Sequence, residues 1–238
     1  PKIHDELRRT KKNQPTHAKV LRFLKKAKAQ NLYVRGSSVI RKGWSLEEAT
    51  NYLKTLPVDA IKAQAVRLPN NNPLALNEEE REKYFRQLDN VAVETIKQIS
   101  RNQYPQDDRF TNRVLQLLSS QRRNSFCGAG KWTFGMASDG TMLPSVLLAG
   151  KENTVLGNIG DNGEWVNNGF KWTLDHPLRE NCKECWALPL CGGGCPTMMS
   201  VCGEDECQLV RKNCELALGI YGTFLYKRED LLVHAGVT

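Results

Sequence analysis

The chain has 238 residues, and 40% of them are hydrophobic, so it is long enough to bury a core without disulfide cross-links. No apolar run approaches the roughly 20 residues that a membrane-spanning helix requires, and no secretory signal peptide is visible, so we expect a soluble cytoplasmic protein with no membrane partner. The formal net charge of +8 is spread along the chain without a recognisable nucleic-acid-binding motif, so we do not expect nucleic acid as a partner.

Helical and strand patterns alternate in the first half of the chain. Apolar side chains recur with a helical period in residues 16–29, and residues 31–39 have the pattern of a strand. Ser45 and Glu48 have the spacing of a capping box, which predicts a second helix from there to about residue 55.

A further strand and helix follow in the same order. Residues 60–66 have the pattern of a strand, and Asn77 is a candidate cap for a long helix whose apolar side includes Tyr84 and Leu88. Helices that alternate with strands predict parallel βα units. The two strands need further partners, because a parallel sheet is stable only with several strands and with both faces covered.

The character of the sequence changes near residue 124, where helical periodicity stops and glycine, asparagine, aspartate and cysteine become more frequent. Residues 132–137 and 141–147 flank Ser138-Asp139-Gly140, which is typical of a β-hairpin turn. Apolar spacing predicts a final helix over about residues 208–226.

Eight cysteines are present, and none precedes Cys127. In a chain without a visible secretory signal, this density indicates metal binding rather than a disulfide framework. Four of them form the motif C-x2-C-x5-C-x3-C, namely Cys182, Cys185, Cys191 and Cys195, and three more follow, namely Cys202, Cys207 and Cys214. Thiolates bind both iron–sulfur clusters and zinc, so a structural zinc domain remains an alternative. The glycines at 192–194 allow a sharp turn and present backbone N–H groups to cluster sulfides.

The segment from Cys182 to Pro196 resembles the core of the SPASM domain, an extension of radical S-adenosylmethionine enzymes that binds auxiliary iron–sulfur clusters. Cys127 matches the first cysteine of the SPASM pattern, Gly140 matches its hairpin glycine, and residues 156–159 resemble its connecting segment. This resemblance covers residues 126–226 or thereabouts, and its motifs are specific.

The first half of the chain resembles the same family. Residues 1–8 are similar to the segment after the fourth barrel strand, and residues 34–37 and 60–66 resemble the fifth and sixth strands. The resemblance therefore implies an α/β fold. In it, residues 1–123 form the C-terminal half of a partial (β/α)6 barrel, and residues 124–238 form a small, cysteine-rich α+β SPASM domain.

Two features depart from the family pattern. The C-x3-C-x2-C loop, which binds the catalytic cluster and S-adenosylmethionine in the family, is absent from this sequence. We therefore expect that the chain as written does not make a radical by itself, and that it is either part of a longer protein or a truncated form. Ser145 stands where the family hairpin carries a cysteine, and serine is a poor cluster ligand. An engineered substitution and a natural loss both remain open.

The resemblance implies two auxiliary [4Fe-4S] clusters. It assigns to the first cluster Cys127, the position of Ser145, and Cys195. Cys202 has no counterpart in the family pattern, so it either completes the first cluster in place of Ser145 or is a free thiol.

The second cluster takes the remaining cysteines of the motif. The resemblance assigns to it Cys182, Cys185 and Cys191, closed by either Cys207 or Cys214. We favour Cys207 because it lies where the final helix is expected to begin. Cys214 lies about two turns further along, where a buried apolar thiol is the simpler interpretation.

Three residues on the expected strands are candidates for binding S-adenosylmethionine: Arg35, Ser37 and Gln64. In the family, side chains at the C-terminal ends of the barrel strands reach this cofactor. A salt bridge or a surface position is the alternative for Arg35 and Ser37, and a packing role is the alternative for Gln64.

Taken together, the resemblance implies a radical S-adenosylmethionine maturase, an oxidoreductase that modifies a ribosomally made peptide or protein. The expected product is a crosslink such as a thioether, or an oxidised side chain. The auxiliary clusters would transfer electrons or bind substrate, with a flavodoxin or ferredoxin as donor, and the intact enzyme would add S-adenosylmethionine on a third cluster. The alternative is a non-catalytic iron–sulfur or zinc module that binds a peptide or relays electrons.

Overall fold

The computed structural model describes residues 1–130, 132–150, 154–160, 163–167 and 180–227. These residues belong to two compact units. The first unit consists of Pro1–Leu115 together with the segment that begins at Gly219, and the second consists of Gln116–Leu218. The domain boundary expected between residues 123 and 124 stays a prediction.

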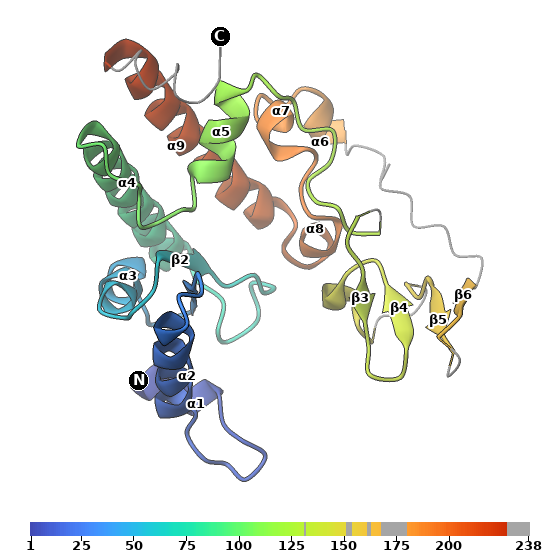
Figure 1. The fold of residues 1–238 in the computed structure, drawn as a ribbon. Coiled ribbons are helices and arrows are strands. Elements are labelled where there is room, and N and C mark those ends of the chain that lie inside the picture. The colour runs from blue at the N-terminus through green and yellow to red at the C-terminus, as the bar shows by residue number, and fades with distance from the viewer. Residues whose placement is uncertain (131, 151–153, 161–162, 168–179, 228–238) are drawn as a thin grey trace. The chain divides into compact units, whose positions relative to one another are not determined.

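The first unit contains most of the alternating helices and strands (Figure 1). Its elements are α1 (Lys2–Leu7), α2 (His17–Ala29), β1 (Arg35–Ile40), α3 (Leu46–Lys54), β2 (Ala60–Ala65), α4 (Glu78–Ser100) and the start of α5 (Thr111–Leu118). Both expected helix caps are present: Ser45 and Asn77 each form a complete capping box at the start of α3 and α4. β1 begins at Arg35, later than the expected residue 31.

β1 and β2 pair in parallel, from Arg35 opposite Ala60 to Ile40 opposite Ala65. A single parallel bridge also joins Ile61 of β2 to Asp107, so the segment before α5 extends this sheet. The arrangement agrees with the expected α/β class built from parallel βα units. The partial six-stranded barrel stays a prediction.

The two faces of this sheet have different neighbours. Gly36 faces α3, because a side chain added at this position would come within 3.3 Å of that helix. Side chains alternate along a strand, so Ser37 and its partner Lys62 lie on the opposite face. By the same alternation, Arg35 and Gln64 also lie on this second face. The face turned away from α3 is therefore the polar one.

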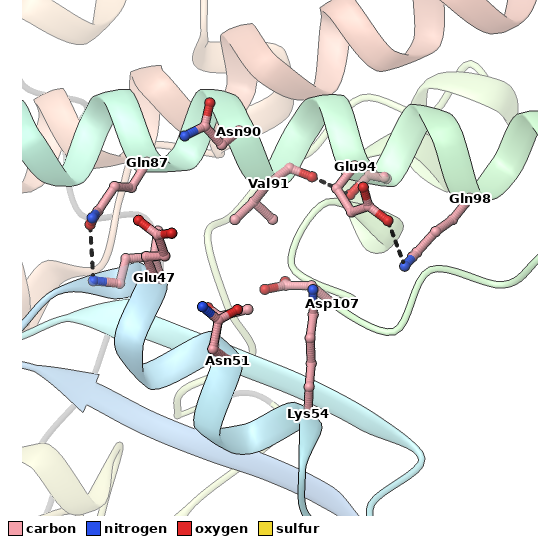
Figure 2. Close-up of a pocket in the computed structure, with 12 residues that line it drawn as sticks. Glu47, Asn51, Lys54, Gln87, Asn90, Val91, Glu94, Gln98 and Asp107 are labelled. Atoms are coloured by element: carbon pink, nitrogen blue, oxygen red, sulfur yellow. Dashed lines mark hydrogen bonds between the residues drawn. The ribbon is translucent and has the colours of Figure 1, made fainter.

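α3 and α4 form the two walls of a groove in the first unit (Figure 2). The start of α3 is joined to the middle of α4, where the side-chain Oε1 of Gln87 accepts a hydrogen bond of 3.0 Å from the backbone N–H of Leu46. The core of the unit includes the fully buried side chains of Ile40, Leu46, Ile61, Leu88 and Phe110.

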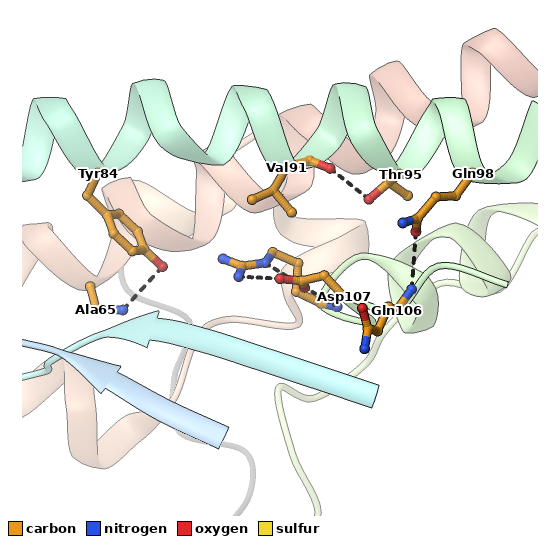
Figure 3. Close-up of polar contacts among 8 residues, drawn as sticks. Ala65, Tyr84, Val91, Thr95, Gln98, Gln106 and Asp107 are labelled. Carbon is orange, nitrogen blue, oxygen red and sulfur yellow. Dashed lines mark hydrogen bonds and ion pairs between the residues drawn. The ribbon is translucent and has the colours of Figure 1, made fainter. Parts of the chain in front are cut away.

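A buried ion pair lies next to this core. Arg109 donates from Nε to one carboxylate oxygen of Asp107 at 2.8 Å and from a terminal nitrogen to the other at 2.6 Å. Both side chains are more than nine-tenths buried. Figure 3 shows Asp107 beneath α4, on the same side as Tyr84, whose hydroxyl accepts a hydrogen bond from the backbone N–H of Ala65. The segment after α4 is held against β2 by backbone hydrogen bonds, from the N–H of Ile61 to the carbonyl of Gln106 at 2.8 Å and from the N–H of Asp108 to the carbonyl of Ile61 at 3.3 Å.

The second unit combines a small sheet with short helices. Its elements are the end of α5, β3 (Gly135–Met136), β4 (Thr141–Leu143), the 3-10 helix η1 (Val146–Leu148), β5 (Gly157–Ile159), β6 (Trp165–Asn167), α6 (Glu180–Lys183), α7 (Leu188–Cys191), α8 (Pro196–Cys202) and most of α9 (Glu204–Lys227). The strands form an antiparallel sheet in the order β3-β4-β5-β6. The expected hairpin is confirmed as β3–β4, with Gly140 at a φ of +83° in its turn.

The longest helix, α9, has 24 residues and begins at Glu204, earlier than the expected residue 208. Cys207 therefore lies within its first turn. Neither α9 nor another helix in the described ranges combines the length and the apolar character that crossing a membrane requires.

Candidate functional site

Four cysteines line one small pocket in the second unit. They are Cys182 in α6, Cys185 in the turn that follows it, Cys191 at the end of α7, and Cys207 in the first turn of α9. No disulfide bond joins any of the eight cysteines of the chain. Thiols from a short helix, a turn, a second short helix and a long helix thus converge on one hollow.

Polar groups contact these thiols from two directions. The pKa of Cys191 is raised to about 11, mainly by burial and secondly by the neighbouring thiol of Cys214. Backbone N–H groups of Gly193 and Gly194 hydrogen-bond to the Cys191 sulfur and act in the opposite direction, since they favour the thiolate. Arg211 is hydrogen-bonded to Cys185, and this contact raises the pKa of the Arg211 guanidinium. A bound cation would therefore displace a proton from Cys191, next to donors that stabilise its thiolate.

The donor set fits an iron–sulfur cluster. Iron–sulfur clusters are held by four cysteine thiolates, and N–H groups directed at the sulfurs tune them. Within the described ranges, no three His, Cys, Asp or Glu side chains are gathered closely enough to hold a single metal ion. A structural zinc ion needs four ligands converging at about 2.0–2.3 Å from one centre. Four thiolates around one pocket suit an iron–sulfur cluster and equally a structural zinc ion.

The environments of Cys207 and Cys214 differ. Cys207 is partly buried and lines the pocket. Cys214 is fully buried in an apolar cluster with Ala187, Leu190 and Val210, against which Cys185 and Cys191 also pack, and it does not line the pocket. This environment supports the interpretation of Cys214 as a core thiol and of Cys207 as the closing ligand, which stays a prediction.

The residues assigned to a first cluster lie outside this pocket. Cys127 is exposed, Cys195 is the buried N-cap residue of α8, and Cys202 ends the same helix. The hydroxyl of Ser145 accepts a hydrogen bond of 3.3 Å from the backbone N–H of Leu147 and begins η1. Ser145 thus has a local structural role as a cap, and the first cluster stays a prediction.

The glycine turn after Cys191 is packed against the segment that leads to Cys127. Gly192 has a φ of +72°, and a Cβ added there would lie 2.5 Å from the carbonyl carbon of Ser125. Gly192→Ala should therefore destabilise the chain by at least roughly 1–3 kcal/mol, the usual cost of backbone strain, and lower its metal content. Urea unfolding and iron analysis measure the two effects.

A matched control separates the effect of backbone strain at a positive φ from the effect of the steric clash of the added Cβ. Gly43 has a positive φ of +76°, close to that of Gly192, but a Cβ there meets nothing within 4 Å. Gly43→Ala should destabilise the chain by about 1 kcal/mol through backbone strain alone, with an unchanged metal content. If the two variants behave alike, the close packing at Gly192 does not support the cysteine pocket.

The polar face of the β1–β2 sheet carries the three residues assigned to S-adenosylmethionine. Arg35 begins β1 and forms an ion pair with the buried carboxylate of Asp108. Gln64 lies opposite Val39, four residues further along the strands, which separates it from Arg35 by roughly 13 Å at 3.3 Å per residue. Arg35 therefore lies at the amino-terminal end of the sheet, and the assignment of Arg35, Ser37 and Gln64 to S-adenosylmethionine stays a prediction.

Two further polar residues on this face, Lys62 and Asp108, were not predicted from the sequence. Lys62 lies opposite Ser37. Burial is the main cause that lowers the pKa of its ammonium group, and the nearby positive charge of Arg113 lowers it further. The negative charge of Asp108 acts in the opposite direction. The signal for Lys62 was available, because it precedes Gln64 by two residues and so shares its face. The sequence around Asp108 carried no such signal, because Asp108 follows Asp107, whose single bridge to β2 comes after a loop and is too short to show a strand pattern.

No family model and no curated protein matches the chain. Solved structures of anSMEcpe, an anaerobic sulfatase-maturating enzyme of the radical S-adenosylmethionine/SPASM type, do match it. Native anSMEcpe with bound AdoMet has a TM-score of 0.70 at 18% identity over 95% of this chain. The same enzyme with bound AdoMet and the Kp18Cys peptide has a TM-score of 0.68 at 17% identity over 99% of this chain.

The chain spans 66% of the length of both of these solved chains. At this level of identity, the likeness concerns the fold. It confirms, as a fold, the resemblance to part of a radical S-adenosylmethionine/SPASM enzyme that the sequence motifs predicted.

Proposed function

We propose that the chain is part of a radical S-adenosylmethionine enzyme that modifies a peptide, and that its second unit holds an auxiliary [4Fe-4S] cluster. The observation that carries this proposal is the convergence of Cys182, Cys185, Cys191 and Cys207 on one pocket. The fold supports it, because the similar anSMEcpe structures contain AdoMet and, in two cases, a peptide as well.

The surroundings of the pocket suit this role. A [4Fe-4S] cluster bound there supplies one-electron transfer. The N–H groups of Gly193 and Gly194 stabilise the Cys191 thiolate, and Arg211 places a positive charge beside Cys185. The apolar cluster around Leu190 and Val210 excludes water from one side.

Finer features of the proposal come from the family resemblance. The reaction is a crosslink, such as a thioether, or the oxidation of a side chain, and a flavodoxin or ferredoxin supplies electrons. The first auxiliary cluster takes Cys127, Cys195 and Cys202. Arg35, Ser37 and Gln64 contribute to S-adenosylmethionine binding in a partial (β/α)6 barrel. Radical formation requires a cluster loop that these 238 residues do not contain, so the activity belongs to the intact enzyme.

Anaerobic purification with iron, sulfide and zinc analysis tests the cluster. We expect a brown protein with about four irons and four sulfides per chain if only the pocket is loaded, and about eight of each with both clusters. A colourless protein with stoichiometric zinc would overturn the iron–sulfur assignment and favour a structural zinc module.

An assay of the intact enzyme tests the catalysis. With S-adenosylmethionine, a reductant and a cysteine-containing peptide, we expect cleavage of S-adenosylmethionine together with a mass change in the peptide. An iron-loaded protein that carries its own cluster loop and still changes no peptide would instead be a non-catalytic electron-transfer or binding module.

A further inference from the structure

The groove between α3 and α4 is a separate site from the cysteine pocket and from the polar face of the sheet. It has a volume of about 220 Å³. Because one water occupies about 30 Å³, this space is large enough for a small organic molecule. Its walls follow from helical spacing: Glu47, Asn51 and Lys54 recur along α3, and Asn90 and Glu94 recur along α4 (Figure 2).

The groove has an excess of negative charge in a chain whose net charge is +8. Glu47 and Glu94 line it, and within the described residues neither forms an ion pair. The carboxylate of Asp107 at the floor is already bound by Arg109 through both oxygens. Lys54 brings one positive charge, and Figure 2 shows its side chain extending toward Asp107 rather than toward Glu47.

A buried hydroxyl also lines the groove. Thr50 is 93% buried, and its Oγ1 has no hydrogen-bond partner in the structure. A buried polar group without a hydrogen-bond partner is unfavourable, so a ligand that bonds to this hydroxyl would be stabilised. Thr50 follows Glu47 by three residues and therefore lies on the same side of α3.

We propose that this groove binds a small organic cation, namely a primary alkylamine or an alkylguanidine. An ammonium group has N–H donors and no acceptor, so it suits a site lined by the carboxylates of Glu47 and Glu94, the hydroxyl of Thr50 and the amide oxygens of Asn51 and Asn90. The alkyl part lies along Val91, which also lines the groove. A divalent metal is a poorer candidate, because the described acidic side chains do not gather into a metal-binding group.

Titration of the full chain with n-butylamine, followed by NMR, tests the proposal. We expect saturable binding in the millimolar range, with no measurable binding of the neutral analogue 1-butanol or the anionic analogue butyrate. Glu94→Gln should weaken butylamine binding about tenfold, because it removes one of the two uncompensated charges while an amide oxygen can still accept the hydrogen bond from Gln98. Thr50→Val should weaken it several-fold.

Glu82→Gln is the matched control, because Glu82 lies on the exposed side of α4 and pairs with Arg86. It should leave butylamine binding unchanged. Equal binding of 1-butanol would show an apolar crevice, preferential binding of butyrate would show that Lys54 dominates, and the absence of saturable binding would show a plain surface groove. Each of these results overturns the proposal. The titration needs neither iron nor S-adenosylmethionine, so its outcome is independent of the proposed enzymatic function.

Discussion

Cys207→Ala should lose about four irons per chain, whereas Cys214→Ala should keep its iron. The reason is that Cys207 lines the pocket with three of the four motif cysteines, while Cys214 is enclosed in the apolar cluster beside Leu190 and Val210. Cys191→Ala serves as the positive control and should lose the same four irons. Iron and sulfide analysis of anaerobically reconstituted protein, together with the visible absorption spectrum, measures the difference.

The two variants should also differ in stability. Replacing the buried thiol of Cys214 leaves a small cavity, so Cys214→Ala should lower the free energy of unfolding of the metal-free chain by roughly 0.5–3 kcal/mol. Cys207→Ala should change that value less, because Cys207 is only partly buried. Retention of iron in Cys207→Ala and its loss in Cys214→Ala would identify Cys214 as the closing ligand instead.

Arg109→Ala should be among the most destabilising substitutions in the first unit, at about 3–5 kcal/mol. It leaves the carboxylate of Asp107 in a site that is more than nine-tenths buried, without the guanidinium that donates to both of its oxygens. Circular dichroism during urea unfolding measures this loss.

Two further variants make this prediction specific. Arg86→Ala breaks an ion pair on the exposed side of α4, with a distance of 3.6 Å to Glu82, and should change stability by less than about 1 kcal/mol. The double variant Asp107→Leu/Arg109→Met removes both buried charges and should recover much of the loss. If Arg109→Ala is as mild as Arg86→Ala, the buried pair does not hold the segment after α4 in place.

Several features of the fold were predictable because their signals are local. The capping boxes at Ser45 and Asn77 depend on residues three positions apart, and the hairpin depends on a turn that Gly140 completes with a positive φ. The short elements around the cysteines, such as α6 and α7 with four residues each, are too brief to show a period and were not predicted.

The cysteine motif by itself determined that the second half of the chain is a metal-binding candidate, because the spacing of Cys182, Cys185 and Cys191 brings three thiols together within one short segment. The motif did not decide which cysteine provides the fourth thiol. Cys207 and Cys214 are seven residues apart and so share one face of α9, and helical spacing alone does not distinguish them. Only the packing of α9 against Ala187 and Leu190 separates a thiol that lines the pocket from one in the core.

Contacts between distant segments likewise emerged only from the tertiary structure. The pair of Arg35 with Asp108 and the groove between α3 and α4 join residues that are tens of positions apart. Which side chains meet across such distances depends on the register of β1 against β2 and on how the helices pack over the sheet. The local sequence therefore determined the helices and strands and the kind of chemistry, and long-range packing decided which residues share a site. The reason is that burial and strand register act between segments that carry no local signal of each other.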